Sequence, residues 1–180
     1  MTQKITMIYR NYISDSGEVV TARQFGMVSW EESKADKANL KHHPYSKPLG
    51  VFWILDDLRP VNFNPSIFHR ISIDVLDDRS GVLVIHNVDD DRADYSFLPP
   101  PNNAAIFNAD GSLRFVLENP LTGCPGELNF FRAVDVKDEN GEKALGICIA
   151  VARGQGLETF LVDGSTPDLK SVVRSSRPNI

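Results

Sequence analysis

The side chains best suited to chemistry lie in one acidic stretch, residues 86–103, which reads HNVDDDRADYSFLPPPNN. It holds one histidine and four aspartates, Asp89, Asp90, Asp91 and Asp94. A calcium loop of the EF-hand type, counted from Asp89, needs an oxygen ligand at position 5 and a carboxylate at position 12, where this chain has Ala93 and Pro100. That motif is excluded. A magnesium ion held by one or two carboxylates stays open, but a hydrated loop or a partner-binding surface is favoured, because charge clusters in loops are usually solvated.

Two histidines offer a second kind of chemistry. His69 and His86 lie in alternating segments that pair if Asp77–Gly81 forms a turn. They could then act as the base and the acid of a metal-independent nuclease, with Arg70 or Arg79 holding the phosphate. The surrounding acidic charge opposes phosphate binding, so packed or exposed bystander histidines are favoured.

Other catalytic signatures are absent from the sequence. Cys124 lies in the turn-like Thr-Gly-Cys-Pro-Gly, but the Cys-x5-Arg spacing of a phosphatase is missing, because Arg132 follows eight positions on. A structural cysteine is therefore favoured there, Cys148 in its apolar run is expected in the core, and a disulfide between the two stays open. The His42-His43 pair lacks a nearby Cys or third His for zinc. We predict no catalytic residue, no metal and no cofactor.

The formal net charge is −5, and the acidic excess lies in the middle of the chain. Residues 51–100 carry nine aspartates and four arginines, a net charge of −5, against +2 for residues 1–50 and −2 for residues 101–180. An acidic surface repels nucleic acid and favours a basic partner or a cation. We therefore expect a protein partner and no nucleic-acid partner.

No apolar run approaches the roughly 18 residues that a transmembrane helix needs. The first residues, MTQKITMIYR, also lack the apolar segment and cleavage site of a secretory signal. We expect a cytoplasmic protein with no membrane partner.

Aromatic residues lie among the acidic residues and suggest a docking surface. Rings supply buried area in an interface, and carboxylates steer the encounter with a basic protein. For Phe52 and Trp53, inside an apolar run, a core position is favoured instead, whereas for Tyr95 and Phe97 the two interpretations are balanced. The predicted partner-binding residues are Asp77, Asp78, Asp89, Asp90, Asp91, Asp94, Tyr95 and Phe97.

The elements that must position these side chains are predicted to be strands, because apolar and polar residues alternate at period two through most of the chain. Residues 4–13 and 19–27 read as a hairpin, as do 67–76 with 82–88 and the two halves of 104–117. Residues 127–136, 145–152 and 157–162 read as a three-stranded meander, and 50–55 as a further strand. The capping box Ser29-Trp-Glu-Glu32 opens the one expected helix, about Trp30 to Leu40.

This pattern predicts a mainly β fold (a β-rich α+β class) of antiparallel, hairpin-linked strands. The sheet could be a large twisted sheet, a sandwich or a partly open barrel, with the one short helix in its N-terminal half. We expect a single domain over residues 1–165 and a loosely ordered tail over residues 166–180.

One predicted hairpin is similar to hairpins found in a known group of binding proteins. It comprises residues 104–115, AAIFNADGSLRF, and is followed by Glu118-Asn-Pro120. With its acidity and lack of catalytic motifs, the chain resembles the immunity proteins of bacterial polymorphic toxin systems, including those of contact-dependent growth inhibition. The resemblance implies an inhibitor that binds a cognate protein toxin, often a nuclease, and occludes its active site. It carries no binding residue over to this chain. The alternatives are a small-molecule-binding β-barrel or sandwich domain, and a hydrolase or nuclease using His69 and His86.

Overall fold

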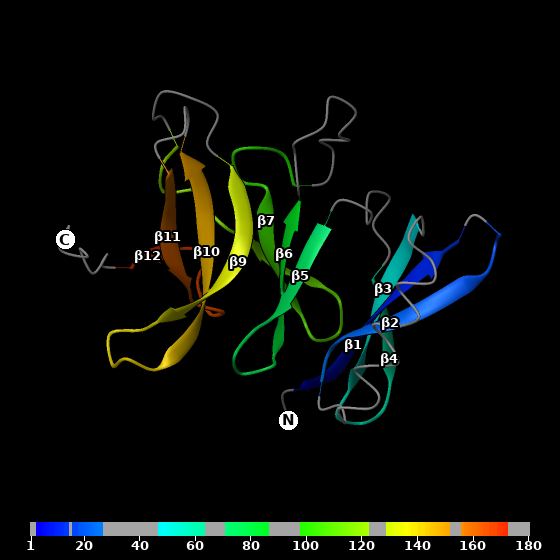
Figure 1. Ribbon diagram of the computed structural model, residues 1–180. Coiled ribbons are helices and arrows are strands. Elements are labelled where there is room, and N and C mark those ends of the chain that lie inside the picture. Colours follow the sequence, from blue (N-terminus) through cyan, green and yellow to red (C-terminus); the bar gives the residue numbers. More distant parts are fainter. Residues whose placement is uncertain are drawn as a thin grey trace, which may run out of the picture.

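The computed structural model describes residues 3–14, 16–26, 47–63, 71–86, 98–122, 129–151 and 156–172. Every regular element in these ranges is a β-strand, and the strands form three antiparallel sheets of four strands each (Figure 1). The predicted antiparallel, hairpin-linked β fold is thus confirmed, whereas the predicted helix at residues 30–40 lies outside the described residues. Within the described ranges, no helix has the length and apolar character needed to cross a membrane.

The three sheets follow one another along the sequence. The N-terminal sheet has the order β2-β1-β3-β4, from β1 (Ile5–Ile13), β2 (Val19–Phe25), β3 (Lys47–Leu55) and β4 (Pro60–Phe63). The middle sheet has the order β5-β6-β7-β8, from β5 (Ile71–Val75), β6 (Gly81–His86), β7 (Ala104–Asn108) and β8 (Leu113–Val116). The C-terminal sheet has the order β12-β11-β10-β9, from β9 (Phe130–Lys137), β10 (Lys143–Val151), β11 (Gly156–Val162) and β12 (Leu169–Ser171).

Most of these strands coincide with predicted ones, because each hairpin is specified by local alternation and a short turn. Two short strands, β4 and β12, have no counterpart in the prediction. β12 lies within residues 166–180, the segment predicted as a loosely ordered tail, and its residues pair with Phe160, Leu161 and Val162 of β11. Residues 169–171 therefore extend the C-terminal sheet.

The central strands of the middle sheet, β6 and β7, are buried on both faces, so the molecule is a stack of three β-layers. All six residues of β6 are buried. Since successive side chains of a strand point to opposite faces, Val82 and Val84 pack into a cluster with the N-terminal sheet, and Leu83 and Ile85 into a cluster with the C-terminal sheet. This arrangement explains the continuous apolar run of β6, which is typical of a strand covered on both sides.

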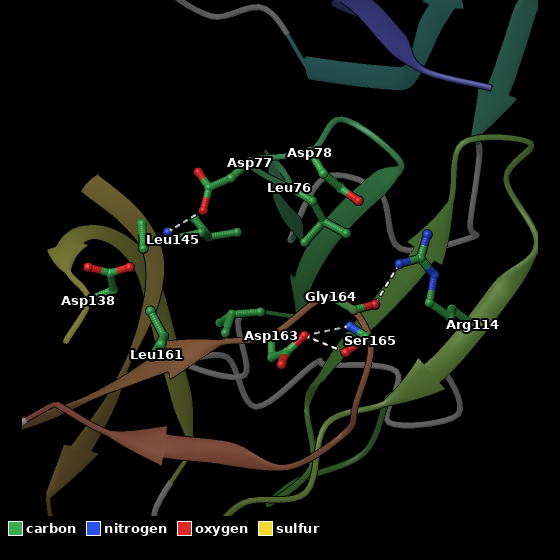
Figure 2. Close-up of a pocket in the computed structure, with 12 residues that line it drawn as sticks. Leu76, Asp77, Asp78, Arg114, Asp138, Leu145, Leu161, Asp163, Gly164 and Ser165 are labelled. Atoms are coloured by element: carbon green, nitrogen blue, oxygen red, sulfur yellow. Dashed lines mark hydrogen bonds between the residues drawn. The ribbon is translucent and has the colours of Figure 1, made fainter. Parts of the chain in front are cut away.

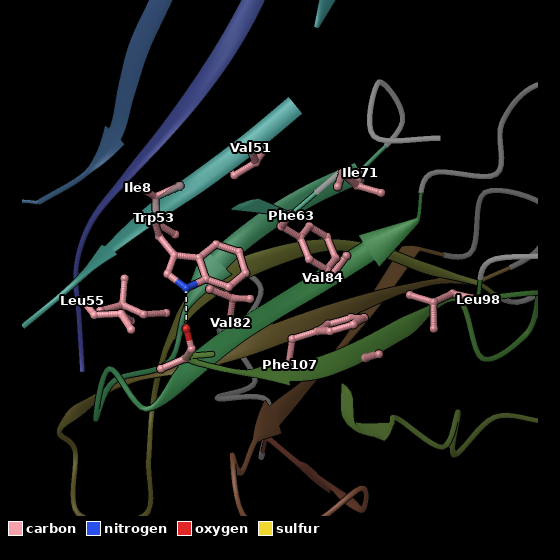
Figure 3. Close-up of a cluster of buried hydrophobic side chains, with 13 residues drawn as sticks. Ile8, Val51, Trp53, Leu55, Phe63, Ile71, Val82, Val84, Leu98 and Phe107 are labelled. Atoms are coloured by element: carbon pink, nitrogen blue, oxygen red, sulfur yellow. Dashed lines mark hydrogen bonds between the residues drawn. The ribbon is translucent and has the colours of Figure 1, made fainter. Parts of the chain in front are cut away.

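Trp53 anchors the N-terminal sheet on the middle sheet, which confirms its predicted core position (Figure 3). Its indole Nε1–H donates a hydrogen bond of 2.6 Å to the carbonyl oxygen of Ala109. The Phe63 ring lies 5.6 Å from the Trp53 ring and 4.8 Å from the Phe107 ring, centroid to centroid. Phe52, on the other face of β3, is half-buried and stacks on Tyr9 at 5.0 Å.

Asn103 links the middle sheet to the C-terminal sheet. Its buried side-chain amide donates to the carbonyl oxygens of His86 (2.6 Å) and Phe130 (2.9 Å), and its Oδ1 accepts the Phe130 N–H at 2.8 Å. Asn103 thereby satisfies both backbone groups of Phe130 at the start of the edge strand β9, where a neighbouring strand would otherwise be needed.

Candidate functional site

Alternate loops of the fold meet at one end of the stack, the lower end in Figure 1. Three backbone hydrogen bonds join neighbouring loops or the start of β1: Asp56 N–H to Lys4 O (2.8 Å), Ile5 N–H to Arg79 O (2.9 Å) and Ala109 N–H to Ser80 O (2.9 Å). Asp77 Oδ2 accepts the Leu145 N–H at 2.9 Å, which brings the start of β10 to the same place. We call this region the acidic end. It consists of the loops 56–59, 76–80, 109–112, 138–142 and 163–168.

The five loops of the acidic end hold ten Asp or Glu residues and two arginines, a net charge of −8. The whole chain has a net charge of −5, so everything outside these loops sums to +3. The acidic end therefore concentrates negative potential on one surface of the described part of the chain.

Aspartate recurs in these loops because its side chain stabilises the turns. Five aspartates accept, through Oδ1, the backbone N–H two residues further on, an Asx-turn that fixes the start of the loop. The acceptors are Asp57, Asp78, Asp110, Asp138 and Asp163, at 3.2, 3.0, 2.9, 2.9 and 2.9 Å. The same carboxylates build the loops and supply the surface charge.

Several of these carboxylates are held in the charged form. The Ser165 hydroxyl and amide lower the pKa of Asp163 below its ordinary value, and Ser112 does the same for Asp110. The Arg59 side chain lowers the pKa of Asp57 and pairs with it at 2.7 Å. A hydrogen bond or a cation that favours the ionised carboxylate explains each shift.

A pocket of about 460 Å³ opens at the acidic end, between the middle and C-terminal sheets (Figure 2). Leu76, Leu145 and Leu161 contribute apolar lining, and Figure 2 shows carboxylates around it. The aspartates that line the pocket are Asp77, Asp78, Asp138 and Asp163. Such a pocket suits a positively charged group on an aliphatic stem.

Arg114 is the cation in the pocket lining, and it holds the surrounding loops together. Its Nε donates to Asn108 Oδ1 (2.7 Å), its Nη1 to Gly164 O (2.5 Å) and its Nη2 to Ser80 O (2.9 Å). Asn108 is the last residue of β7, whereas Gly164 and Ser80 belong to the β11–β12 and β5–β6 connections. Because all three are uncharged, the guanidinium fixes the loops without using up one of the pocket carboxylates.

The predicted site residues are divided by the structure. Asp77 and Asp78 are exposed and line the pocket, together with Asp138 and Asp163, which were not among the predicted site residues. The other predicted residues, Asp89, Asp90, Asp91, Asp94, Tyr95 and Phe97, lie outside the described residues. His86, from which that stretch continues, ends β6 and is separated from Asp77 and Asp78 by the length of the strand.

The candidate catalytic residues gain no support from their surroundings. His86 is fully buried, and its Nδ1 lies 3.3 Å from the Leu98 carbonyl oxygen, so a substrate does not reach it as a general acid or base requires. His69, Arg70 and Cys124 lie outside the described residues. Cys148 is buried with a free thiol, as expected for a core cysteine. Within the described ranges, no three Asp, Glu, His or Cys side chains gather as a metal site needs.

Comparisons with protein-family models, with curated proteins and with solved structures gave no match to this chain.

Proposed function

We propose that this chain is a cytoplasmic binding protein that neutralises a cognate, basic, nuclease-type toxin by covering the toxin's active site. The observation that carries the proposal is the acidic end, where five loops from all three sheets bring a net charge of −8 to one surface around a pocket.

The proposed mechanism is electrostatic attraction followed by steric occlusion. A nuclease holds phosphates in a basic groove, and carboxylates displayed on rigid turns can occupy that groove in place of nucleic acid. The loops of the acidic end are suited to this because Asx-turns and the Arg114 contacts fix them before binding, which lowers the entropy lost on association. The pocket would receive a lysine or arginine side chain of the toxin.

The first experiment is a pull-down of the tagged chain from its native cell extract at low and at high salt, with identification of the retained protein by mass spectrometry. We expect one basic protein, retained about one to one at low salt and weakened by salt. The purified partner should show a nuclease activity that the chain inhibits. A partner whose activity is unchanged by saturating amounts of the chain would refute neutralisation.

A double variant tests the acidic end itself. Asp77→Asn with Asp78→Asn removes two charges, while asparagine keeps an acceptor oxygen for the Leu145 and Ser80 amides. Association with the captured protein at low salt should slow by about threefold to tenfold, because charges at the rim of an interface act mainly on the association rate. The matched control, Glu18→Gln with Glu158→Gln, removes two charges at the opposite end of the molecule and should leave the rate nearly unchanged. Equal effects of the two double variants would argue against the acidic end.

The pocket volume supports one alternative. A volume of about 460 Å³ falls within the range of small-molecule sites. Since four carboxylates line the pocket, its ligand would be a small organic cation rather than an apolar molecule. Saturable binding of spermidine that survives physiological salt, with no protein partner in the pull-down, would favour this function.

A further inference from the structure

Four hairpins of the described chain use the same loop. In each, the first loop residue donates its N–H to the carbonyl of the residue four positions on and accepts the N–H of the residue three positions on. These two bonds close a tight hairpin loop whose fourth residue lies in the left-handed region. The loops join Ser14 to Glu18, Leu55 to Arg59, Asn108 to Ser112 and Asp138 to Glu142.

Only one of these four loops places a side chain at the left-handed position. Gly17, Gly111 and Gly141 take that position with φ of 82°, 86° and 81°, and Leu58 takes it with φ of 66°. Glycine is the usual residue there because any Cβ crowds the following carbonyl oxygen. Leucine at Leu58 therefore strains a loop that the same chain builds elsewhere without strain.

Contacts within the chain do not compensate for that strain. Leu58 is 77% exposed, the highest exposure of any large hydrophobic residue described, so its side chain adds little to the core. Val19 and Leu113, at 57% and 54%, are also exposed, but they lie in strands with ordinary backbone angles. Backbone strain clusters at functional positions, so the strained and exposed Leu58 is a candidate for contact with another molecule.

The surroundings of Leu58 indicate what that molecule presents. Leu58 follows the exposed Asp56 and Asp57 in a loop of the acidic end. Asp56 N–H binds Lys4 O, which ties this loop to the β1 terminus beside the Asp77–Asp78 turn. An aliphatic side chain next to carboxylates complements an apolar recess bordered by arginine or lysine.

We propose that Leu58 is the apolar anchor of the acidic end and inserts into an apolar recess, bordered by basic side chains, on a protein partner. The proposal rests on the proposed function, since it takes the acidic end as the docking surface, and it adds a specific residue and a specific partner chemistry. Such anchors, surrounded by polar contacts, carry much of the affinity of protein interfaces.

The test uses the full-length, ¹⁵N-labelled chain and two synthetic peptides of equal length and charge. One alternates arginine with leucine, and the other alternates arginine with glycine. In NMR titrations, the wild type should bind the arginine–leucine peptide about tenfold more tightly, the affinity expected from burying about one leucine side chain. The shifted resonances should include the amide of Leu58.

Three variants decide the origin of that preference. Leu58→Gly and Leu58→Asn both suit the left-handed position and should bind the two peptides with equal affinity. Val19→Asn, which alters an exposed apolar residue at the far end of the molecule, should keep the full preference.

The outcomes separate this inference from the proposed function. If both peptides bind at the acidic end but the preference is absent, or persists in Leu58→Gly, Leu58 is not the anchor while the acidic docking surface stands. If neither peptide binds even at low salt, the acidic end is not a docking surface for basic proteins, and both proposals are overturned.

Discussion

Substituting Leu58 is expected to change the stability of the fold and the affinity for a partner in opposite directions. The left-handed backbone destabilises the folded state by roughly 1–2 kcal/mol for a residue with a Cβ. Glycine avoids this strain, but its unfolded chain is more flexible, which reduces the gain in stability by roughly 0.5–1 kcal/mol. Leu58→Gly is therefore expected to raise the free energy of unfolding by about 0.5–1 kcal/mol in urea titrations. Leu58→Ala keeps the strain and is the control. A glycine variant less stable than the alanine variant would contradict the strain at this position.

Asp74 is expected to make stability depend on pH. Burial raises the pKa of Asp74, and the charge of Asp135 raises it further. A raised pKa in the folded state favours folding only below the ordinary aspartate value of about 4, and this contribution is lost as pH rises through the folded pKa. Ionised Asp74 therefore destabilises the protein at neutral pH.

Asp74→Asn should accordingly raise the melting temperature at pH 7, and its advantage should disappear below about pH 4. Thermal melts of both proteins at neutral and acidic pH measure this difference, and Asp56→Asn, at an exposed loop position, is the control. An advantage that persists unchanged at acidic pH would exclude titration of Asp74 as its cause.

At the scale of elements, Asn103 is the polar link between β6 and β9. Asn103→Ala would leave the N–H and C=O of Phe130 and the C=O of His86 without that partner inside the molecule. We expect a loss of about 3 kcal/mol in the free energy of unfolding, since each buried group left unpaired costs roughly 1–3 kcal/mol. Asn62→Ala, at an exposed position of β4, should change it by less than about 0.5 kcal/mol. A chain that tolerates both substitutions equally would show that the amide link is dispensable.

The hairpins were predictable from the sequence, and the stacking of the sheets was not. A hairpin such as β7–β8 is specified by alternation and by Asn108-Ala-Asp-Gly111, all within a few residues. The apolar run Gly81–His86 predicts a strand, but it does not predict which residues cover the two faces of that strand. The covering residues lie far away in the sequence. β4 and β12, of four and three residues, are too short to show a period.

At the scale of the whole molecule, the acidic surface depends on chain topology. Asp77 and Asp78 were identified from a local charge cluster, but Asp138 and Asp163 lie about 60 and 85 residues further on and join them only in the fold. One signal was available: in a chain of antiparallel hairpins, alternate loops fall at the same end, and aspartate recurs in alternate loops here.

Substitution of the aspartates in residues 89–94 tests the electrostatic proposal separately. Replacing Asp89, Asp90, Asp91 and Asp94 with asparagine is expected to slow association with the captured basic protein and to flatten its salt dependence, measured by stopped-flow at several ionic strengths. The Asp77→Asn, Asp78→Asn variant examines the acidic end independently. An unchanged low-salt rate for the fourfold variant would exclude this stretch from the docking surface.

The burial of the middle sheet on both sides means that the chain cannot be divided into smaller working modules. If the C-terminal sheet were removed by a protease or by early termination of translation, Leu83 and Ile106 would face water, although β5–β8 and most of the acidic loops would still be present. Removing the N-terminal sheet would uncover Val82 and Phe107 in the same way. Either fragment would display a broad apolar face and aggregate, so a shortened product is not expected to persist as a weaker binder.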